Sequence, residues 1–326
     1  NFKKALTIKP DYAEVYFNMG NALKKVVFSK PRPDLQKVIT EILDRKTYVR
    51  PVEISSAAIS LLTFEPVLQK VLRQQSKGQL TQFLHETVLS LTELPLLLKL
   101  MGVCPIADLK LEGVLAVVRS GLLSSISELE SLSEVLHFQS ALALQCFTNE
   151  YIYNQNDTET RALQTLEAEV GEALFNGEQP SPQSVLCLAS YKALHEYEWC
   201  DLVAVTSDIE EVFSRQVIEP KQEARLKPDI PALEEITNKV SAKVREQYES
   251  NPYPRWMHLG LPFKSLPISK LVDEVKLRLF DNTINEVEAP NILIAGCGTG
   301  EHSIVVASRF KNTAVLAVDL SLSSLA

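Results

Sequence analysis

The sequence lacks the long apolar run of a membrane span and any excess of basic charge. Its apolar stretches, such as Leu94 to Leu100, are interrupted by proline or charged residues well short of the roughly 18 residues that a spanning helix requires. Its 33 Lys and Arg stand against 41 Asp and Glu, a formal net charge of -8. Nucleic acid and anionic membrane surfaces attract the opposite sign of charge. We therefore predict that the chain neither spans a membrane nor binds nucleic acid.

The sequence also lacks cysteine and histidine patterns of the kind that bind metals. The five cysteines show no C-x-x-C spacing, so neither a zinc site nor a disulfide framework is predicted, and a reducing, cytoplasmic setting is expected. Four of the five histidines have no partner at metal-ligand spacing and are expected on the surface or packed in the core. These residues are Cys104, Cys146, Cys187, Cys200, Cys297, His85, His137, His195 and His258.

The remaining composition is that of an ordinary folded protein. The 326 residues are 45% hydrophobic and 23% charged, which allows a sizeable core and about two domains. The chain begins at Asn1 rather than Met, and residues 1 to 9 lack the apolar core of a secretion signal. We expect it to be an excerpt of a longer protein.

Residues 1–28 show the apolar spacing of two short helices separated by Pro10 and Asp11. The pattern resembles the tetratricopeptide repeat, in which small residues let two helices pack closely. The residues that carry the resemblance are Phe2, Ala5, Pro10, Tyr16, Met19, Gly20 and Leu23. It implies a surface for a protein or peptide partner and further repeats before Asn1, because a single repeat cannot bury its apolar face. An unrelated amphipathic hairpin is the alternative.

Residues 29–218 are predicted to form one large, all-helical domain. Helical apolar spacing predominates from about Ser29 to Phe213, and alternating strand patterns are almost absent. We expect breaks at the turn-forming clusters 30–33, 50–51, 102–105, 154–157 and 176–182. Two pairs are candidate helix starts, namely Ser127 with Glu130 and Thr158 with Arg161.

The stretch 219–231 contains three prolines and mixed charges without an apolar period, so it is predicted to be a linker between domains. A last domain then covers 232–326, opening with helices over 232–248 and 269–280. Between these helices, two prolines flank Tyr253 and an Arg255-Trp256 pair follows. This segment is predicted to be extended, as either a packing strap or a wall of a ligand site.

The end of the sequence predicts a strand, a glycine loop, a helix and a second strand in series. Residues 291–295 are a continuous apolar run typical of a strand buried on both faces of a parallel sheet. Gly296, Gly298 and Gly300 follow it, then a helix over 301–310 and a second buried strand over 313–318. Asp319 comes directly after that strand.

The order of strand, glycine loop, helix, strand and acid indicates which ligands the loop could bind. Glycine lets the backbone turn sharply and approach a ligand, and an acid after the second strand can accept hydrogen bonds from both hydroxyls of a ribose. The dinucleotide fingerprint G-x-G-x-x-G/A would place a small residue at position 301. Glu301 stands there, and its carboxylate would repel a pyrophosphate, so NAD or FAD is disfavoured.

The run from Ile292 to Gly300 resembles the first motif of class I S-adenosylmethionine-dependent methyltransferases. The wider match, over 248–256 and 292–325, is to bacterial proteins that join tetratricopeptide repeats to such a domain. The resemblance implies S-adenosylmethionine as cofactor and a Rossmann-like domain. It also implies a set of cofactor-binding residues: Gly296, Cys297, Gly298, Thr299, Gly300, Asp319 and Leu320.

The resemblance also has limits. Many members carry an acid two residues before the first glycine, where this chain has Ile294. A class I domain has seven strands, of which only the first two are predicted here, so we name no catalytic residue and expect the excerpt itself to be inactive. The expected fold is mainly α with a C-terminal α/β part, and the expected function is methyl transfer to an unknown acceptor.

Two other functions stay open at this point. Ile294 permits a protein-interaction scaffold with a degenerate methyltransferase domain, and tolerance of Glu301 would permit an NAD-linked oxidoreductase. Within the loop, Cys297 is expected to fill the turn rather than act as a nucleophile. His302 is expected to be a solvated histidine of the first helical turn rather than a group beside the cofactor.

Overall fold

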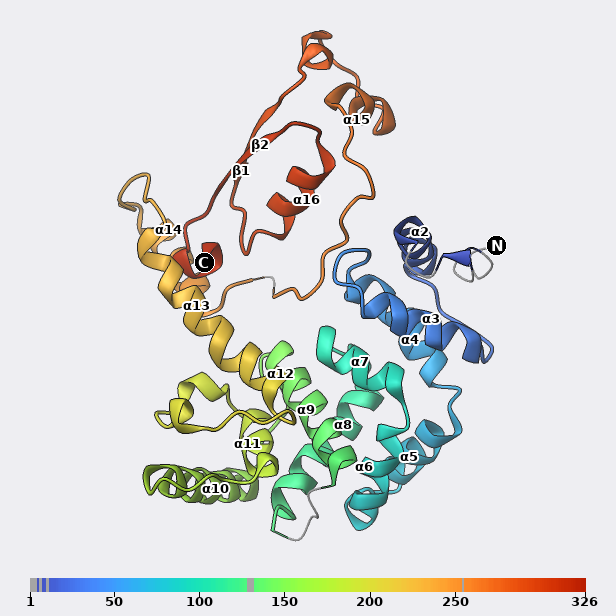
Figure 1. The fold of residues 1–326 in the computed structure, drawn as a ribbon, viewed down its shortest axis with the longest axis vertical. Coiled ribbons are helices and arrows are strands. Elements are labelled where there is room, and N and C mark those ends of the chain that lie inside the picture. The colour runs from blue at the N-terminus through green and yellow to red at the C-terminus, as the bar shows by residue number, and fades with distance from the viewer. Residues whose placement is uncertain (1–4, 6–7, 10–11, 128–131, 254) are drawn as a thin grey trace. The chain divides into compact units, whose positions relative to one another are not determined.

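The chain forms two compact units, each assembled from separate segments (Figure 1). The computed structural model describes residues 1–326 except 1–4, 6–7, 10–11, 128–131 and 254. One unit, here called the C-terminal unit, consists of Asn1–Asn21, Arg45–Arg50 and Gln222–Ala326. The other, here called the helical unit, consists of Ala22–Asp44 and Pro51–Lys221. The last of the four divisions between the units, after Lys221, falls within 219–231, whereas the segment 45–50 leaves the surrounding helices and joins the C-terminal unit.

Helices fill the helical unit, and none of its described residues is in a strand. The all-helical prediction for 29–213 is therefore confirmed. In chain order its α-helices are α3 Pro33–Leu43, α4 Pro51–Leu62, α5 Pro66–Ser76, α6 Leu84–Thr92, α7 Pro95–Val103, α8 Leu109–Ser124, α9 Ser133–Thr148, α10 Asp157–Phe175, α11 Pro182–Ala189 and α12 Glu210–Phe213. Short 3-10 turns, η1 Thr81–Phe83, η2 Leu194–Glu196 and η3 Cys200–Leu202, and a π-helical turn, η4 Ser214–Ile218, complete it.

Proline marks where many of these helices begin. Helices α3, α4, α5, α7 and α11 each start with a proline, whose fixed φ suits the first turn and whose missing N–H would be unpaired there anyway. The predicted breaks at 30–33, 50–51 and 176–182 match these starts.

One predicted helix start was assigned to the wrong residue. The N-cap of α10 is Asn156, whose side chain accepts from the N–H groups of Thr158 and Glu159, and Glu159 completes a capping box. Thr158 is thus the second helical residue rather than the cap. The other candidate helix start is Ser127 with Glu130. Glu130 lies outside the described residues.

The core of the helical unit is built around α7 and α9, which pack against each other and against α3, α4, α6 and α11. Both helices bury most of their side chains; Leu97, Leu100, Met101 and Phe138 are all inaccessible to solvent. A helix that is apolar all round is typical of the centre of a large core. This position explains the leucine-rich run 94–100 without any membrane.

A buried charged network joins α8, α10 and the segment that follows α11. The guanidinium of Arg119 donates to the carbonyl of Asn154 at 2.9 Å and lies 3.6 Å from the carboxylate of Glu159. Tyr191 donates its hydroxyl proton to the same carboxylate at 2.9 Å, and its ring centroid is 4.1 Å from the guanidinium carbon. Charges are buried stably when they are paired and hydrogen-bonded, so this network joins α8 and α10 to the residue Tyr191 after α11.

The predicted linker 219–231 is mostly helical, which corrects the expectation of an irregular segment. Helix α13 Glu219–Leu226 follows directly from η4, and a 3-10 turn, η5 Lys227–Asp229, follows α13. The π-helical turn ends just before Pro220, where the regular hydrogen-bond ladder has to be interrupted because proline has no N–H. The absence of an apolar period in this stretch agrees with the structure, because α13 buries no side chain.

The C-terminal unit begins with α2 Ala13–Leu23, the second helix of the predicted hairpin. Val15, Tyr16, Met19 and Leu23 of this helix are buried, and Ala22 is exposed. Most of the first predicted helix, including Phe2 and Pro10, lies outside the described residues.

Helix α2 packs on the segment 45–50 rather than on a neighbouring repeat. The ring of Tyr16 stacks on Tyr48 with centroids 6.2 Å apart, and the guanidinium of Arg45 lies 4.0 Å from the centroid of Tyr16. A Cβ at Gly20 would come within 3.0 Å of the Cβ of Val49. The small residue of the motif therefore does allow a close approach, but to a segment that contains a turn at 46–48.

Two helices of the C-terminal unit differ in extent from the predictions. Helix α14 Lys239–Ser250 starts seven residues later than the predicted 232–248, because Asn238 caps it by accepting from the N–H groups of Val240 and Ser241. Helix α15 Ile268–Glu274 ends well before residue 280. Its end is set by Lys276, whose φ of 52° cannot continue a right-handed helix.

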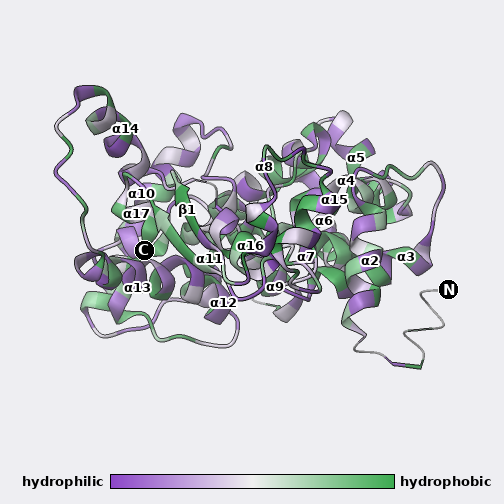
Figure 2. Ribbon diagram, turned by 90° about the horizontal axis from the view of Figure 1, so that it is seen from above, coloured by the Kyte–Doolittle hydropathy of each residue, from purple (hydrophilic) through white to green (hydrophobic). Residues whose placement is uncertain are grey.

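A two-stranded parallel sheet forms the end of the unit. Strands β1 Asn291–Ala295 and β2 Ala314–Val318 pair in register, residue for residue, and α16 Glu301–Arg309 connects them along one side (Figure 1). Figure 2 shows β1 in the colour of hydrophobic residues. The β-α-β unit is thus present, with β2 starting one residue later than predicted.

The strands are not buried on both faces, contrary to the prediction. Leu293 is 64% exposed and Leu316 is 60% exposed, whereas the alternate residues Ile292 and Ile294 are half-buried. Helix α16 contacts β2, and the positions that alternate with the half-buried ones, including Leu293 and Leu316, stay exposed.

Candidate functional site

The glycine loop turns sharply at every one of its three glycines. Gly296, Gly298 and Gly300 have φ angles of 72°, 54° and 81°, in the left-handed region that side chains with a Cβ rarely adopt. A Cβ on Gly296 or Gly300 would meet no other atom within 4 Å. These two glycines are therefore required by backbone conformation, and the space beside them is open.

Asp319 fastens this loop to the end of the second strand. Its Oδ2 accepts from the N–H of Gly298 at 2.8 Å, and its Oδ1 accepts from the N–H of Ser321 at 3.0 Å. The carbonyl of Val318 accepts from the N–H groups of Gly296 and Cys297. An ionised carboxylate has about four acceptor positions, so Asp319 keeps capacity to accept from two further donors.

Cys297 points into the protein and not toward a ligand. The side chain is 7% exposed, and burial, with a further contribution from the negative charge of Asp319, raises the pKa of its thiol. A raised pKa keeps the sulfur protonated and unreactive. The geometry agrees with a residue that fills the turn.

Glu301, the first residue of α16, is paired rather than free. Its carboxylate lies 2.7 Å from the Nε of Arg50 and its side chain is only 13% exposed. A carboxylate is favourable at a helix N-terminus, where backbone N–H groups point outward. Glu301 stands at the position where the dinucleotide fingerprint has a small residue, and the oxidoreductase alternative stays a prediction.

Trp256, in the segment between α14 and α15, contacts the loop. The indole N–H of Trp256 donates to the carbonyl of Thr299 at 3.0 Å, whereas Tyr253 is 66% exposed. Farther along, Leu259 and Leu261 donate their N–H groups to the carbonyls of Lys46 and Thr47. Trp256 is the point where this segment contacts the loop. We call the described residues of 251–261 the strap; whether it also forms a wall of a ligand site stays a prediction.

Glu249, at the end of α14, was not identified from the sequence. Its carboxylate accepts from the N–H groups of Leu322 and Ser323, which open the short helix α17 Leu322–Leu325, and from the hydroxyl of Ser323 at 2.6 Å. Lys227 donates to that same hydroxyl at 2.7 Å. Burial disfavours the charged form, but the hydrogen bonds from Ser323 and Leu322 outweigh it and lower the pKa of Glu249. Only the folded chain brings these distant residues together.

The structure brings most of the predicted cofactor-binding residues into one place. The loop 296–300 and Asp319 are joined by hydrogen bonds, and Leu320, which is 40% exposed, follows at the end of β2. His302 lies on the exposed side of the first turn of α16. These positions agree with a solvated histidine beside a formed loop.

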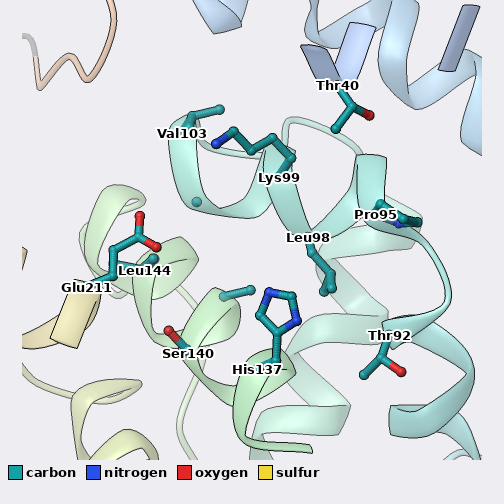
Figure 3. Close-up of a pocket in the computed structure, with 12 residues that line it drawn as sticks. Thr40, Thr92, Pro95, Leu98, Lys99, Val103, His137, Ser140, Leu144 and Glu211 are labelled. Carbon is teal, nitrogen blue, oxygen red and sulfur yellow. The ribbon is translucent and has the colours of Figure 1, made fainter. Parts of the chain in front are cut away.

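The helical unit contains a separate cavity of about 300 Å³, shown in Figure 3. Lys99, His137 and Glu211 lie around it, but the ammonium of Lys99 is already paired with Asp44. Among the described residues, no three His, Cys, Asp or Glu side chains are grouped as metal ligands. All five cysteines are free and buried.

By length and composition, no single helix in the described part of the chain could cross a membrane. The bent pair α4 and α5 passes that test only when both helices are taken together.

Comparison with known proteins identifies no relative of this chain. No protein-family model, no curated protein and no solved structure matches the chain.

Proposed function

We propose that the loop 296–300 and Asp319 bind S-adenosylmethionine, and that the protein transfers its methyl group to an acceptor that is not yet identified. The observation that carries the proposal is the hydrogen bond from Gly298 to Asp319, because it sets an acid directly beside a loop of three left-handed glycines. That combination suits a nucleoside whose ribose hydroxyls need acceptors and whose other parts carry no phosphate.

The donors and acceptors of the site fit such a cofactor. Asp319 retains acceptor positions for two hydroxyls, and the open space at Gly296 and Gly300 lets a ligand approach the backbone. Glu301, paired with Arg50, stands where the dinucleotide fingerprint has a small residue, so the loop departs from that fingerprint. The cofactor supplies a methyl group on a positively charged sulfur; the residues of the loop orient it, and transfer then depends on proximity and alignment with the acceptor.

The N-terminal helices and the helical unit are proposed to bind a protein or peptide partner, in a cytoplasmic protein. The resemblance of residues 1–28 to the tetratricopeptide repeat supports this part of the proposal, and Tyr16, Met19 and Gly20 of that motif are buried.

One observation favours a second candidate, a protein-interaction scaffold that no longer uses the cofactor. Ile294 stands on β1, paired with Ala317, where related methyltransferases carry an acid. Replacing Ile294 with Asp discriminates between the two functions: a large gain in cofactor affinity supports a degenerate site, and no gain supports a site that works without that acid.

The direct test is calorimetric titration of S-adenosylhomocysteine into the protein, with NAD in a parallel titration. We expect binding of the first and none of the second. Binding of NAD alone would revive the oxidoreductase, and binding of neither would favour the scaffold.

A matched pair of glycine variants ties that binding to the loop. Gly300 and Gly177 both have a φ of 81°, and a Cβ at either position would meet no other atom within 4 Å. Alanine therefore imposes a similar backbone strain of about 1 to 2 kcal/mol at each. Gly177→Ala in the helical unit should keep the affinity for S-adenosylhomocysteine, and Gly300→Ala should lose it. Equal affinities for the two variants would contradict a cofactor site at this loop.

A further inference from the structure

Helix α16, which follows the glycine loop, begins without a capping side chain. Its N-cap is Gly300, which supplies no side-chain hydrogen bond, and its first residue is Glu301. In many helices a side chain at this position accepts from the N–H groups of the first turn and holds that turn in place. Because α16 lacks such a bond, the contacts of Glu301 gain importance for the orientation of its first turn.

Arg50 supplies a contact of this kind from a distant part of the chain. Its Nε lies 2.7 Å from the carboxylate of Glu301, and the two side chains are 39% and 13% exposed. A partly buried ion pair is screened by salt much less than an exposed one. Glu301 directly follows Gly300 in the sequence, so the pair holds α16 at the point where the loop ends.

The segment 45–50, which carries Arg50, is itself anchored to other parts of the C-terminal unit. Val49 is 1% exposed, and its Cβ would lie only 3.0 Å from a Cβ at Gly20 of α2. The carbonyls of Lys46 and Thr47 accept backbone hydrogen bonds from the strap. A side chain on an ordered segment loses less conformational freedom when it makes a contact, so Arg50 is well placed to hold Glu301.

The strap holds the residue on the other side of Gly300. The indole N–H of Trp256 donates to the carbonyl of Thr299 at 3.0 Å. Gly300 itself has a φ of 81°, and a glycine has no side chain whose packing could keep it in one conformation. Its two neighbours, Thr299 and Glu301, are both tied to segments outside the β-α-β unit, and these contacts define where Gly300 stands.

We propose that Arg50 is a positioning residue of the cofactor site, which acts through Glu301 to hold the last glycine of the loop in the conformation that receives S-adenosylmethionine. The inference rests on the proposed function of the loop. It adds to the site a residue that lies far from the glycine motif in the sequence. The affinity for the cofactor therefore depends on the segment between α3 and α4 as well as on the β-α-β unit.

Calorimetric titration of S-adenosylhomocysteine into the whole protein tests this role. Arg50→Met should weaken binding about three- to fivefold, the upper range for a partly exposed ion pair, and Arg50→Lys should restore most of the affinity. The control is Arg278→Met, which removes the same charge from an exposed residue of the same unit. Unchanged affinity in Arg50→Met, or an equal loss in both methionine variants, would overturn the proposal.

A double-mutant cycle with Glu301→Gln tests whether Arg50 acts through Glu301. If it does, Glu301→Gln alone weakens binding to a similar extent, and combining it with Arg50→Met causes little further loss. Losses that multiply in the double variant would mean that the two side chains act independently, for example through a direct contact of Arg50 with the cofactor. That result would contradict a positioning role.

A measurement without cofactor separates the failure of this proposal from the failure of the proposed function. Trp199 is only 4% exposed and Trp256 is half-buried, so acrylamide quenching of tryptophan emission reports mainly on Trp256 beside the loop. Arg50→Met should raise the quenching constant of the free protein, and Arg278→Met should leave it unchanged. Equal constants in these two variants would overturn the positioning role. A raised constant in a protein that binds no S-adenosylhomocysteine would instead contradict the proposed function and leave Arg50 as a residue that positions the loop.

Discussion

The backbone N–H of Gly298 donates to the carboxylate of Asp319 at 2.8 Å. This single hydrogen bond joins the loop after β1 to the end of β2, so the two parts of the candidate site hold each other in place. Because the acceptor is charged, the bond is among the stronger kinds in proteins. The loop is therefore formed before any ligand arrives.

Asp319→Asn should weaken the binding of S-adenosylhomocysteine about tenfold to a hundredfold, since hydrogen bonds to a charged group contribute about 1.5 to 3 kcal/mol. Isothermal titration calorimetry measures the change. The control is Asp273→Asn at an exposed position of α15 in the same unit, which should bind as the unchanged protein does. Unaltered affinity in the Asp319 variant would exclude this carboxylate from the cofactor site.

Trp256→Phe removes the hydrogen bond to the carbonyl of Thr299 while keeping an aromatic ring in the strap. We expect the free energy of unfolding to fall by about 1 kcal/mol, the typical net contribution of one hydrogen bond. Urea denaturation followed by circular dichroism provides the measurement. Tyr253→Phe, at an exposed ring of the same strap, should have no effect; a similar loss there would mean that the bond to Thr299 is unimportant.

Arg119→Met should destabilise the helical unit by about 3 to 5 kcal/mol, because it leaves the carboxylate of Glu159 buried without its cation. Urea denaturation again gives the value, with Arg161→Met at an exposed position of α10 as the control. Adding Glu159→Leu to the first variant should recover part of the stability, because no unpaired charge then remains. A double variant less stable than the single one would argue against the ion pair as the cause.

Stability should fall as the pH rises above about 9. Burial raises the pKa of Cys104, Cys146 and Cys187 from 9.0 to about 12. The pKa of each thiol is higher in the folded state, so the unfolded chain releases these protons at a lower pH. The three thiols therefore contribute fully to the free energy of unfolding below pH 9, and that contribution is lost as the pH approaches 12. Unfolding free energies measured between about pH 8 and pH 11 test the trend, and Cys187→Ala should make the decline less steep.

Much of the local structure could be predicted because its signals lie within a few residues of each other. Pro33, Pro51 and Pro182 mark helix starts directly, and the glycines after residue 295 mark the turn of the loop. The same range of sequence also contains Asp319, so the main elements of the candidate site could be named in advance.

Contacts between distant segments could not be predicted in this way. The pairing of Arg50 with Glu301, and of Glu249 with Ser323, depends on how the whole unit folds. Likewise, the exposure of Leu293 depends on which elements cover the sheet, and a buried strand and a half-covered one have the same apolar sequence. The end of α15 at Lys276 depends on a backbone angle that lysine does not signal.

The segment 45–50 has a consequence for how the protein reaches its native state. Its carbonyls at Lys46 and Thr47 accept from Leu259 and Leu261, so the C-terminal unit cannot be completed until most of the chain has been synthesised. Pairing over such a separation carries a large loop-closure entropy and forms slowly. We expect the helical unit to fold first, and a fragment starting at residue 222 to lack an integral part of its own unit.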